Sequence, residues 1–313
     1  MKKSLLIISM VLITGLLLTG CEGLLTGEDG TGELALFIAD APVNEIDEVN
    51  VTLDSVEVNR EGESWKTIQD FSDEDNGRKT FNLLDLRFDE ELLGQEMLPT
   101  GNYTQIRLIV VANEDKENSS AEIGESYVSF KDDEKDDINL FIPSGEQTGL
   151  KIHHDFLIEE DIITRLLLDN DVREILNTKP ENADRGYILR PTAIEVIDKN
   201  VSGEIEGQVV DQNEEAITDY DVVVEALDEN DELVTDTVAS TDEENDKPAG
   251  SFRLRGLDEE GTYSVDAYIE DDEGDIIFEA EERITDIEVE AGEVTELEDK
   301  LIIDLSDEEN NDD

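Results

Sequence analysis

The chain has 313 residues, and its 85 Asp and Glu against 23 Lys and Arg give a formal net charge of −62. A field of this sign repels nucleic acid and anionic lipid headgroups, so both are excluded as partners. Such a composition is typical of a disordered chain, or of a folded protein whose surface carboxylates are screened by concentrated salt. The acids occupy the polar positions of alternating segments such as DVVVEAL and YSVDAYIE, which favours a folded, halophilic protein.

Residues 1–20 have the features of a signal peptide. A positively charged start precedes an apolar run over residues 5–18, which is too short for a comfortable membrane span. The run ends in Leu18-Thr19-Gly20-Cys21, which resembles a bacterial lipobox. That resemblance implies diacylglycerol on the sulfur of Cys21, a membrane anchor and an extracytoplasmic location. Because Cys21 is the only cysteine, the chain has no intramolecular disulfide and no cysteine-based zinc site.

Residues 21–32 are rich in Gly and acids, which predicts a flexible tether between the lipid and the folded part. From residue 33 to residue 199 the apolar residues recur with period two, and a slip near Ser55 predicts a bulge. The alternation predicts strands at the following segments: ELALFIADAP, EVNVTLDSVEVNR, SWKTIQ, RKTFNLLDL, YTQIRLIVV, SYVSF, INLFIP, GLKIHHDFLI and GYILRPTAIEVI. A further strand ends at Leu168, and a short helix is predicted near 171–178, before Pro180.

Residues 200–303 form a second all-strand unit, and residues 304–313 are a polar acidic tail without an apolar pattern. The charge changes at the same boundary, because residues 201–313 hold 42 acids and only 5 bases. Many short strands separated by turn residues predict an all-β fold of two β-sandwich domains in tandem. The two units share Gly-x-Tyr at Gly101 and Gly261, followed by alternation, which we interpret as repeated architecture and not as a repeated site.

Five groups of residues in the first unit resemble the domain-of-unknown-function family 4382 of prokaryotic surface lipoproteins. They are Asp40-Ala41-Pro42, Leu83-Leu84-Asp85-Leu86, Gly101-x-Tyr103-Thr104, Pro143-Ser144-Gly145-x-x-Thr148-Gly149 and Tyr187-x-Leu189-Arg190-Pro191. The element that follows Leu168 departs from the family pattern, since Asn170 stands where the family has an aromatic residue. The resemblance implies an order of strands and a location, and no known activity.

The second unit resembles the carboxypeptidase-regulatory-like domain, a transthyretin-like sandwich classed with the carbohydrate-binding-like folds. The resemblance is carried by Gly203-x-Ile205-x-Gly207-x-Val209-x-Asp211, Gly250-x-Phe252-x-Leu254-x-Gly256-Leu257 and Gly261-Thr262-Tyr263. At 212–216 the sequence QNEEA replaces the usual Asn-Gly-x-Pro turn. The resemblance implies an accessory module and not a peptidase.

Few residues point to chemistry. His153 and His154 are adjacent in a predicted strand, so they face opposite sides and cannot chelate one metal together; we expect one to be buried and one exposed. Trp65 suits either sugar stacking or a strand position, and Ser144 and Thr148 suit either anion binding or a hairpin. No catalytic residue and no cofactor is predicted. A weak calcium site is an alternative to a plain turn, its ligands being Asp228, Asn230 and Glu232, although Leu233 stands where a calcium loop needs glycine.

The sequence therefore predicts a lipid-anchored surface module that binds or supports other molecules and has no catalytic activity. Its partners, besides the membrane, would be a polysaccharide or another surface protein. Two alternatives stay open: carbohydrate binding by the second domain, and hydrolysis of a cell-wall or extracellular polymer. The hydrolase would require a carboxyl group of raised pKa in a pocket beside Trp65 or His153.

Overall fold

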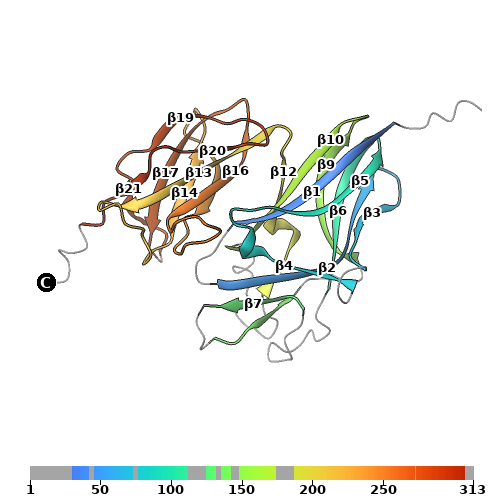
Figure 1. Cartoon of the computed structure of the whole chain (residues 1–313), viewed down its shortest axis with the longest axis horizontal. Coiled ribbons are helices and arrows are strands. Elements are labelled where there is room, and N and C mark those ends of the chain that lie inside the picture. Colours follow the sequence, from blue (N-terminus) through green and yellow to red (C-terminus); the bar gives the residue numbers. More distant parts are fainter. Residues whose placement is uncertain are drawn as a thin grey trace, which may run out of the picture.

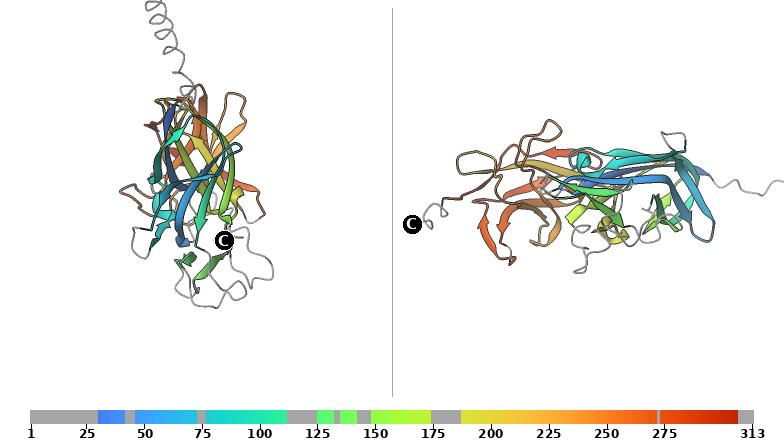
Figure 2. Two further views of the ribbon diagram at one scale, coloured as in Figure 1. Left: turned by 90° about the vertical axis from the view of Figure 1, so that its right-hand side faces the viewer. Right: turned by 90° about the horizontal axis from the view of Figure 1, so that it is seen from below.

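The computed structural model describes residues 30–41, 46–72, 77–111, 125–131, 135–141, 148–173, 187–271 and 273–306. Strands dominate these residues, and the fold is all-β (Figure 1). Within the described ranges no helix is long and apolar enough to span a membrane. The described chain runs from Gly30 at one end of an elongated molecule to Ser306 at the other (Figures 1 and 2).

The first sandwich is built from two sheets. One sheet has the order β12-β10-β1-β5, with bounds Ile194–Asp198, Ile163–Asp171, Thr31–Ala41 and Glu91–Pro99. The other has the order β11-β8-β7-β2-β6-β9, with bounds Tyr187–Ile188, Ile138–Phe141, Tyr127–Phe130, Ile46–Arg60, Gly101–Val110 and Leu150–Ile158. Strands β3 (Trp65–Asp70) and β4 (Lys79–Asn82) also pair with β2. The 3-10 helices η2 (Leu83–Leu86) and η3 (Pro191–Ala193) connect strands.

Alternation explains how the two sheets share one core. On β1, Leu34, Leu36 and Ile38 are buried and face the apolar residues of β2 and β6 across the sandwich. Removing such side chains from water supplies roughly 25 cal/mol per Å² of apolar surface, which favours this pairing of faces over any shifted register. The register of β2 against β6 slips between Leu53 and Ser55, so the predicted bulge is confirmed.

The second sandwich follows Lys199–Val201, and no sheet of the described residues contains strands from both sides of that segment. Its first sheet has β13 (Ser202–Asp211) between β16 (Ser251–Asp258) and β20 (Val294–Glu296), with β21 (Leu301–Ile303) also on β13. Its second sheet has the order β15-β14-β17-β18, with bounds Leu233–Val238, Val222–Leu227, Thr262–Glu270 and Ile276–Glu279. Strand β19 (Ile284–Glu288) pairs with β17, and the sheets enclose a second core centred on Phe252.

Four segments differ from the sequence-based prediction. The segment GYILRPTAIEVI, predicted as one strand, is divided into β11 and β12 by the 3-10 helix η3, because Pro191 starts that turn and has no amide hydrogen to donate to a sheet. Residues 91–99 form strand β5, which the alternation did not indicate. Leu83–Leu86 is a 3-10 turn instead of the end of a strand, because the Asn82 side chain accepts a hydrogen bond from the Leu84 amide and starts the turn. Strand β10 continues to Asp171, three residues beyond the expected end, and residues 172–173 of the predicted helix are helical. The rest of that helix lies outside the described residues.

The two Gly-x-Tyr segments have the same structural role, as predicted. The hydroxyl of buried Tyr103 donates to the Pro99 carbonyl at 3.1 Å, and that of buried Tyr263 donates to the Asp258 carbonyl at 2.9 Å. Each tyrosine thus fastens the start of a strand to the last residue of the strand before it. Gly261 lies under its tyrosine, where an added Cβ would come within 2.3 Å of the hydroxyl oxygen. The repeat is therefore architectural.

Candidate functional site

The two sandwiches meet at the end of β1 that is far from Gly30. An apolar patch of Ala39, Leu167 and Ile197 lies there on the outer surface of the first sandwich. Gly256 of β16 approaches this patch so closely that its missing Cβ would be only 3.4 Å from Ile197. The rest of the junction is polar, and it is the most highly charged buried region among the described residues.

Arg255 is the centre of the junction. Only 4% exposed, it extends from β16 into the first sandwich and donates to three main-chain carbonyl oxygens. These oxygens belong to Asp40 (3.1 Å), Leu86 (3.2 Å) and Arg87 (2.6 Å), and the carboxylate of Asp169 accepts a longer contact at 3.5 Å. Five guanidinium donors in a rigid fork suit such a set of acceptors, which an ammonium group cannot match. Arg255 of the second sandwich is thus held by acceptor groups of the first sandwich.

Further basic side chains cross the same boundary. Arg253 donates to the Phe88 carbonyl and to Glu206, and Arg87 donates to Glu244 at 2.9 Å. Arg173 of the first sandwich donates to Asp236 of the second at 2.6 Å. The other pairs are Lys199 with Glu90 and Glu204, and Lys131 with Asp242. The chain is poor in bases, yet six of its basic side chains join the two sandwiches here, which makes them one body.

Asp40 is the unusual acid of the junction. It is completely buried, and neither of its carboxylate oxygens accepts a hydrogen bond within the described part of the chain. Burial and the nearby charge of Asp169 raise the pKa of Asp40 well above its usual value, against the opposing effect of Arg87 and Arg255. Burial likewise raises the pKa of Asp169 to about 6, although Arg255 lowers it and Glu195 raises it. At Asp40 and Asp169 the surroundings therefore favour the protonated carboxyl group. At Glu206, by contrast, the effect of burial is outweighed by hydrogen bonds from Lys247 and Arg253, which lower its pKa.

The sequence did not indicate this junction. Its ligands are mostly main-chain carbonyls, which leave no residue pattern. One signal was available: SFRLRGL places Arg253 and Arg255 at two successive outward positions of a strand, in a unit with only five bases. The two family segments that contain Asp40 and Leu83–Leu86 also lie at the junction, where the carbonyl oxygens of Asp40 and Leu86 accept hydrogen bonds from Arg255.

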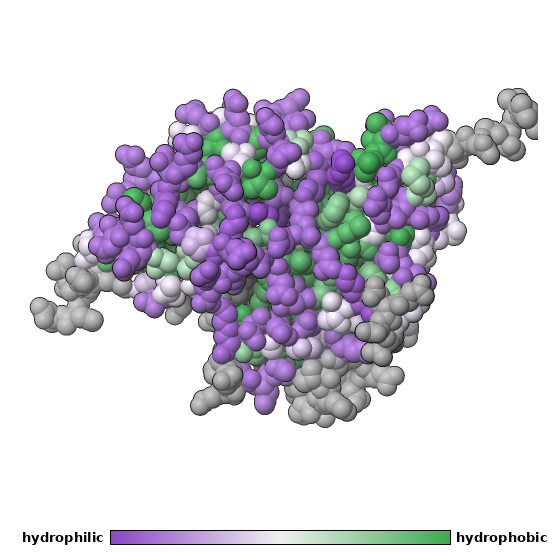
Figure 3. Space-filling model, in the orientation of Figure 1, coloured by the Kyte–Doolittle hydropathy of each residue, from purple (hydrophilic) through white to green (hydrophobic). Residues whose placement is uncertain are grey.

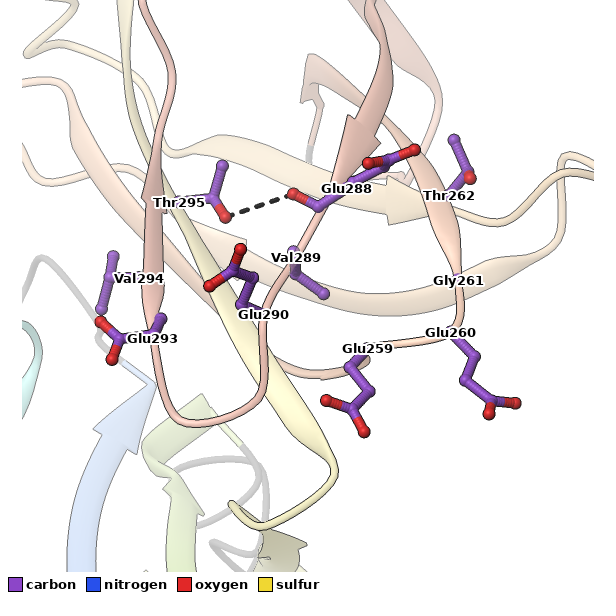
Figure 4. Close-up of a pocket in the computed structure, with 10 residues that line it drawn as sticks. All are labelled: Glu259, Glu260, Gly261, Thr262, Glu288, Val289, Glu290, Glu293, Val294 and Thr295. Carbon is purple, nitrogen blue, oxygen red and sulfur yellow. Dashed lines mark hydrogen bonds between the residues drawn. The ribbon is translucent and has the colours of Figure 1, made fainter.

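A hollow of about 550 Å³ lies at one end of the second sandwich (Figure 4). Five glutamates line it: Glu259, Glu260, Glu288, Glu290 and Glu293. Their side chains point in different directions in Figure 4, and the hydroxyl of Thr295 donates to the Glu288 carbonyl at 3.3 Å. Across the described ranges, no group of three His, Cys, Asp or Glu side chains is arranged to hold a metal ion.

The predicted calcium residues lie in one hairpin turn between β14 and β15. The Asp228 carboxylate accepts hydrogen bonds from the main-chain amides of Asn230 (2.8 Å) and Glu232 (2.9 Å), and from the Asn230 side chain (3.1 Å). Asp231 takes the left-handed conformation at φ 59°, two residues before Leu233, the position at which a calcium loop would have its glycine. Both Asp228 oxygens thus bind the turn itself, and calcium there stays a prediction.

Trp65 lies on the outer face of the first sandwich and is partly exposed. The guanidinium of Arg107 is 4.1 Å from its ring centre, and the Lys151 ammonium is 5.8 Å away. Gly149 packs on the Arg107 side chain, and its neighbour Thr148 is exposed. Ser144 lies outside the described residues, as do the lipobox residues Leu18, Thr19, Gly20 and Cys21.

The expectation for the two histidines was wrong in one respect. His153 is exposed, but His154 is half-buried and not buried. The register of β9 against β6 slips between Tyr103 and Gln105, whose partners are Phe156 and His153. His154 and Asp155 therefore form a bulge, which keeps the His154 ring out of the core.

The family model named Domain of unknown function (DUF4382) matches residues 31–191, just over half of the chain. The chain therefore belongs to this family, as its motifs had suggested. The match covers nearly all of the first sandwich and includes the carbonyl oxygens that bind Arg255. No curated protein matches the chain.

Solved structures share only limited similarity with the chain. The Bacillus anthracis TIE protein is 14% identical at a TM-score of 0.24, over 88% of this chain and 34% of that one, so the chain spans about a third of its length. An alternative pilotin from the type II secretion system of Vibrio cholerae is 20% identical at a TM-score of 0.23, over 32% and 95%. The minor pilin GBS52 of Streptococcus agalactiae is 11% identical at a TM-score of 0.21, over 86% and 95%. Such TM-scores support no inference about function.

Proposed function

We propose that the chain is a lipid-anchored, extracytoplasmic module that binds or supports other molecules at the cell surface, without catalysis and in concentrated salt. The single observation that carries the proposal is the junction, where buried Arg255 joins two sandwiches into one elongated body. An elongated body of this kind is suited to hold a binding face at a distance from a membrane. Hydrophilic side chains cover most of the visible face of both sandwiches, which is consistent with a role in salt (Figure 3).

The path of the chain supports the anchor. Gly30 and Thr31 enter the first sandwich between two loops, with the Thr100 amide donating to the Gly30 carbonyl at 2.8 Å and the Asp161 amide to the Thr31 carbonyl at 3.1 Å. Strand β1 then runs nine residue steps from Thr31, about 30 Å, to the junction at Asp40. A lipid on Cys21 would therefore hold the first sandwich near the membrane and the second sandwich further out.

The resemblance of the second sandwich to carboxypeptidase-regulatory-like domains remains part of the proposal. It supports an accessory module, and carbohydrate recognition by that sandwich is its alternative. The hydrolase alternative required a carboxyl group of raised pKa beside Trp65 or His153. Asp40 and Asp169 of the first sandwich and Glu204 of the second, whose pKa values are raised chiefly by burial, lie at the junction instead.

The anchor is tested by fractionating cells that produce the wild-type chain or Cys21→Ser. The wild type is expected in the membrane fraction, with the mass of the mature chain raised by its acyl groups, and the variant is expected to lose both. A variant that stays equally membrane-bound would refute the lipid anchor.

Adaptation to salt is tested by thermal unfolding between dilute buffer and molar NaCl. The screening length falls from ~10 Å at 0.1 M to ~3 Å at 1 M, so repulsion among the 85 acids should weaken and the melting temperature should rise. An unchanged melting temperature would contradict it. Calcium at the Asp228 turn is tested in the same buffers by comparing calcium binding to the wild type and Asp228→Ala; equal binding would exclude that turn.

A further inference from the structure

Four neighbouring strands of the first sandwich, β3, β2, β6 and β9, present a continuous outer face near Trp65. The strand registers align eight outward side chains in two rows across these strands. The first row is Thr67, Glu57, Arg107 and Lys151, and the second row is Trp65, Asn59, Gln105 and His153. All eight are exposed or half-buried. With strands about 4.8 Å apart, each row is roughly 14 Å long.

The charge of this face differs from that of the rest of the chain. Asp and Glu make up more than a quarter of all residues and fill the outward positions of other strands, but only Glu57 is acidic among these eight. Arg107 neutralises it, since its Nε donates to the Glu57 carboxylate at 2.6 Å. Lys151 has no carboxylate within ion-pair distance in the described part of the chain. The face is therefore close to neutral.

The aromatic ring on this face is held in position. Trp65 and Arg107 are two strands apart, about 10 Å, yet the guanidinium is 4.1 Å from the ring centre. Both side chains must then lean toward each other along the sheet. Because Glu57 fixes Arg107, and Arg107 lies against the indole, the ring is oriented before any ligand arrives.

We propose that this outer face binds a neutral polysaccharide, an inference that rests on the proposed function as a surface binding module and names its ligand class. Asn59, Gln105, His153 and Thr67 carry polar donors and acceptors that pair with sugar hydroxyls, and the part of Trp65 that Arg107 leaves exposed offers apolar surface to a sugar ring. A polyanion is repelled by a net charge of −62. A polycation would find acids elsewhere on both sandwiches and would gain little from a face on which Arg107 already neutralises Glu57.

The single tryptophan makes a direct test available, because intrinsic tryptophan fluorescence of the full chain reports on this face alone. The full-length chain in detergent is titrated with a panel of neutral polysaccharides (β-glucan, mannan, xylan and dextran), with polygalacturonate and polyglutamate as charged comparisons. At least one neutral polymer is expected to change the emission saturably, with an affinity that is equal within twofold at 0.2 M and 2 M NaCl. Neither charged polymer is expected to do so.

Variants then locate the binding. Gln105→Ala combined with His153→Ala keeps the tryptophan and should weaken binding at least tenfold, while Tyr220→Ala, an aromatic on the second sandwich, should leave it unchanged. Circular dichroism and thermal unfolding check that each variant is folded, and retention on immobilised polymer provides a second readout.

The proposal is overturned if no neutral polymer binds, if only a charged polymer binds, or if Tyr220→Ala alone abolishes binding. That last result would assign the sugar to the second sandwich. Membrane association of the wild type and its loss in Cys21→Ser are measured separately, so the surface module can stand even where this face binds no sugar.

Discussion

Two sets of carboxyl groups in this chain respond to their surroundings in opposite ways. In the turns of the second sandwich, the carboxylate of half-buried Asp228 accepts hydrogen bonds from Glu232 and Asn230, which lower its pKa. At the junction, burial raises the pKa of Asp40 and, to about 6, that of Asp169. The turn thus stabilises the charged form of the residue, and the junction stabilises the neutral form.

The difference in pKa follows from position: aspartates lie at the surface in the turns and are buried at the junction. Aspartates on the surface organise turns: Asp211 and Asp228 each accept two main-chain amides of the residues that follow them. The QNEEA segment that departs from the family turn is organised by Asp211 in this way, with Glu214 at φ 64°. At the junction the same kind of side chain is buried beside arginines, where it helps to fix how the two sandwiches meet.

The largest effect is expected from Arg255→Met, which removes the cation and leaves Asp169 and three carbonyl oxygens without their donor. Loss of one partner from such a buried set costs roughly 3–5 kcal/mol, so the free energy of unfolding should fall by that amount. Arg255→Lys should recover only part of it, because an ammonium group cannot reach all the carbonyls. Denaturant unfolding in 2 M NaCl measures the change.

The control for that measurement is Arg283→Met. Arg283 is 40% exposed and pairs with Asp231 at the surface, a type of contact worth about 0–1 kcal/mol. Equal losses for Arg255 and Arg283 would remove the distinction between the junction and the surface.

Asp169→Asn tests the sign of the junction's pH dependence. Since its folded pKa of about 6 exceeds the ordinary 3.8, Asp169 contributes stability below pH 4 that is lost as pH rises to about 6. The neutral amide has no such dependence. The stability of the variant relative to the wild type should therefore rise between pH 4 and pH 7, by on the order of 3 kcal/mol. Unfolding free energies at both pH values measure it, and a difference that is flat or falls with pH would contradict the junction described above.

Much of the fold could be predicted from alternation, and the junction could not. Strands β1, β2 and β6 repeat apolar residues at every second position, so the sequence shows which of their residues face the core. Strand β5 could not be predicted in this way, because its apolar residues occur in adjacent pairs, and it forms by pairing with β1. Arg255 binds carbonyls 168 to 215 residues away in the chain, and a carbonyl is the same for every residue type. Trp65 was recognised as a candidate, but its position beside Arg107 depends on the order of four strands.

The smallest effect is expected from Asp211→Ala, which removes one of the turn aspartates. Burial slightly opposes ionisation of Asp211, but hydrogen bonds from Glu215 and Asn213 outweigh it and lower its pKa. Such a group contributes stability above its unfolded pKa of about 4 and loses it as pH falls through the folded value. The variant should lose about 1 kcal/mol at pH 7, the net value of a hydrogen bond in water, and close to nothing at pH 2.

The matched control for Asp211 is Asp219→Ala, an exposed aspartate in the same sandwich that should change stability little at either pH. Denaturant unfolding at pH 7 and pH 2 measures both variants. If Asp211→Ala lost more stability at pH 2 than at pH 7, the turn aspartates would behave like those of the junction. Burial could then no longer explain the contrast between the turn and the junction.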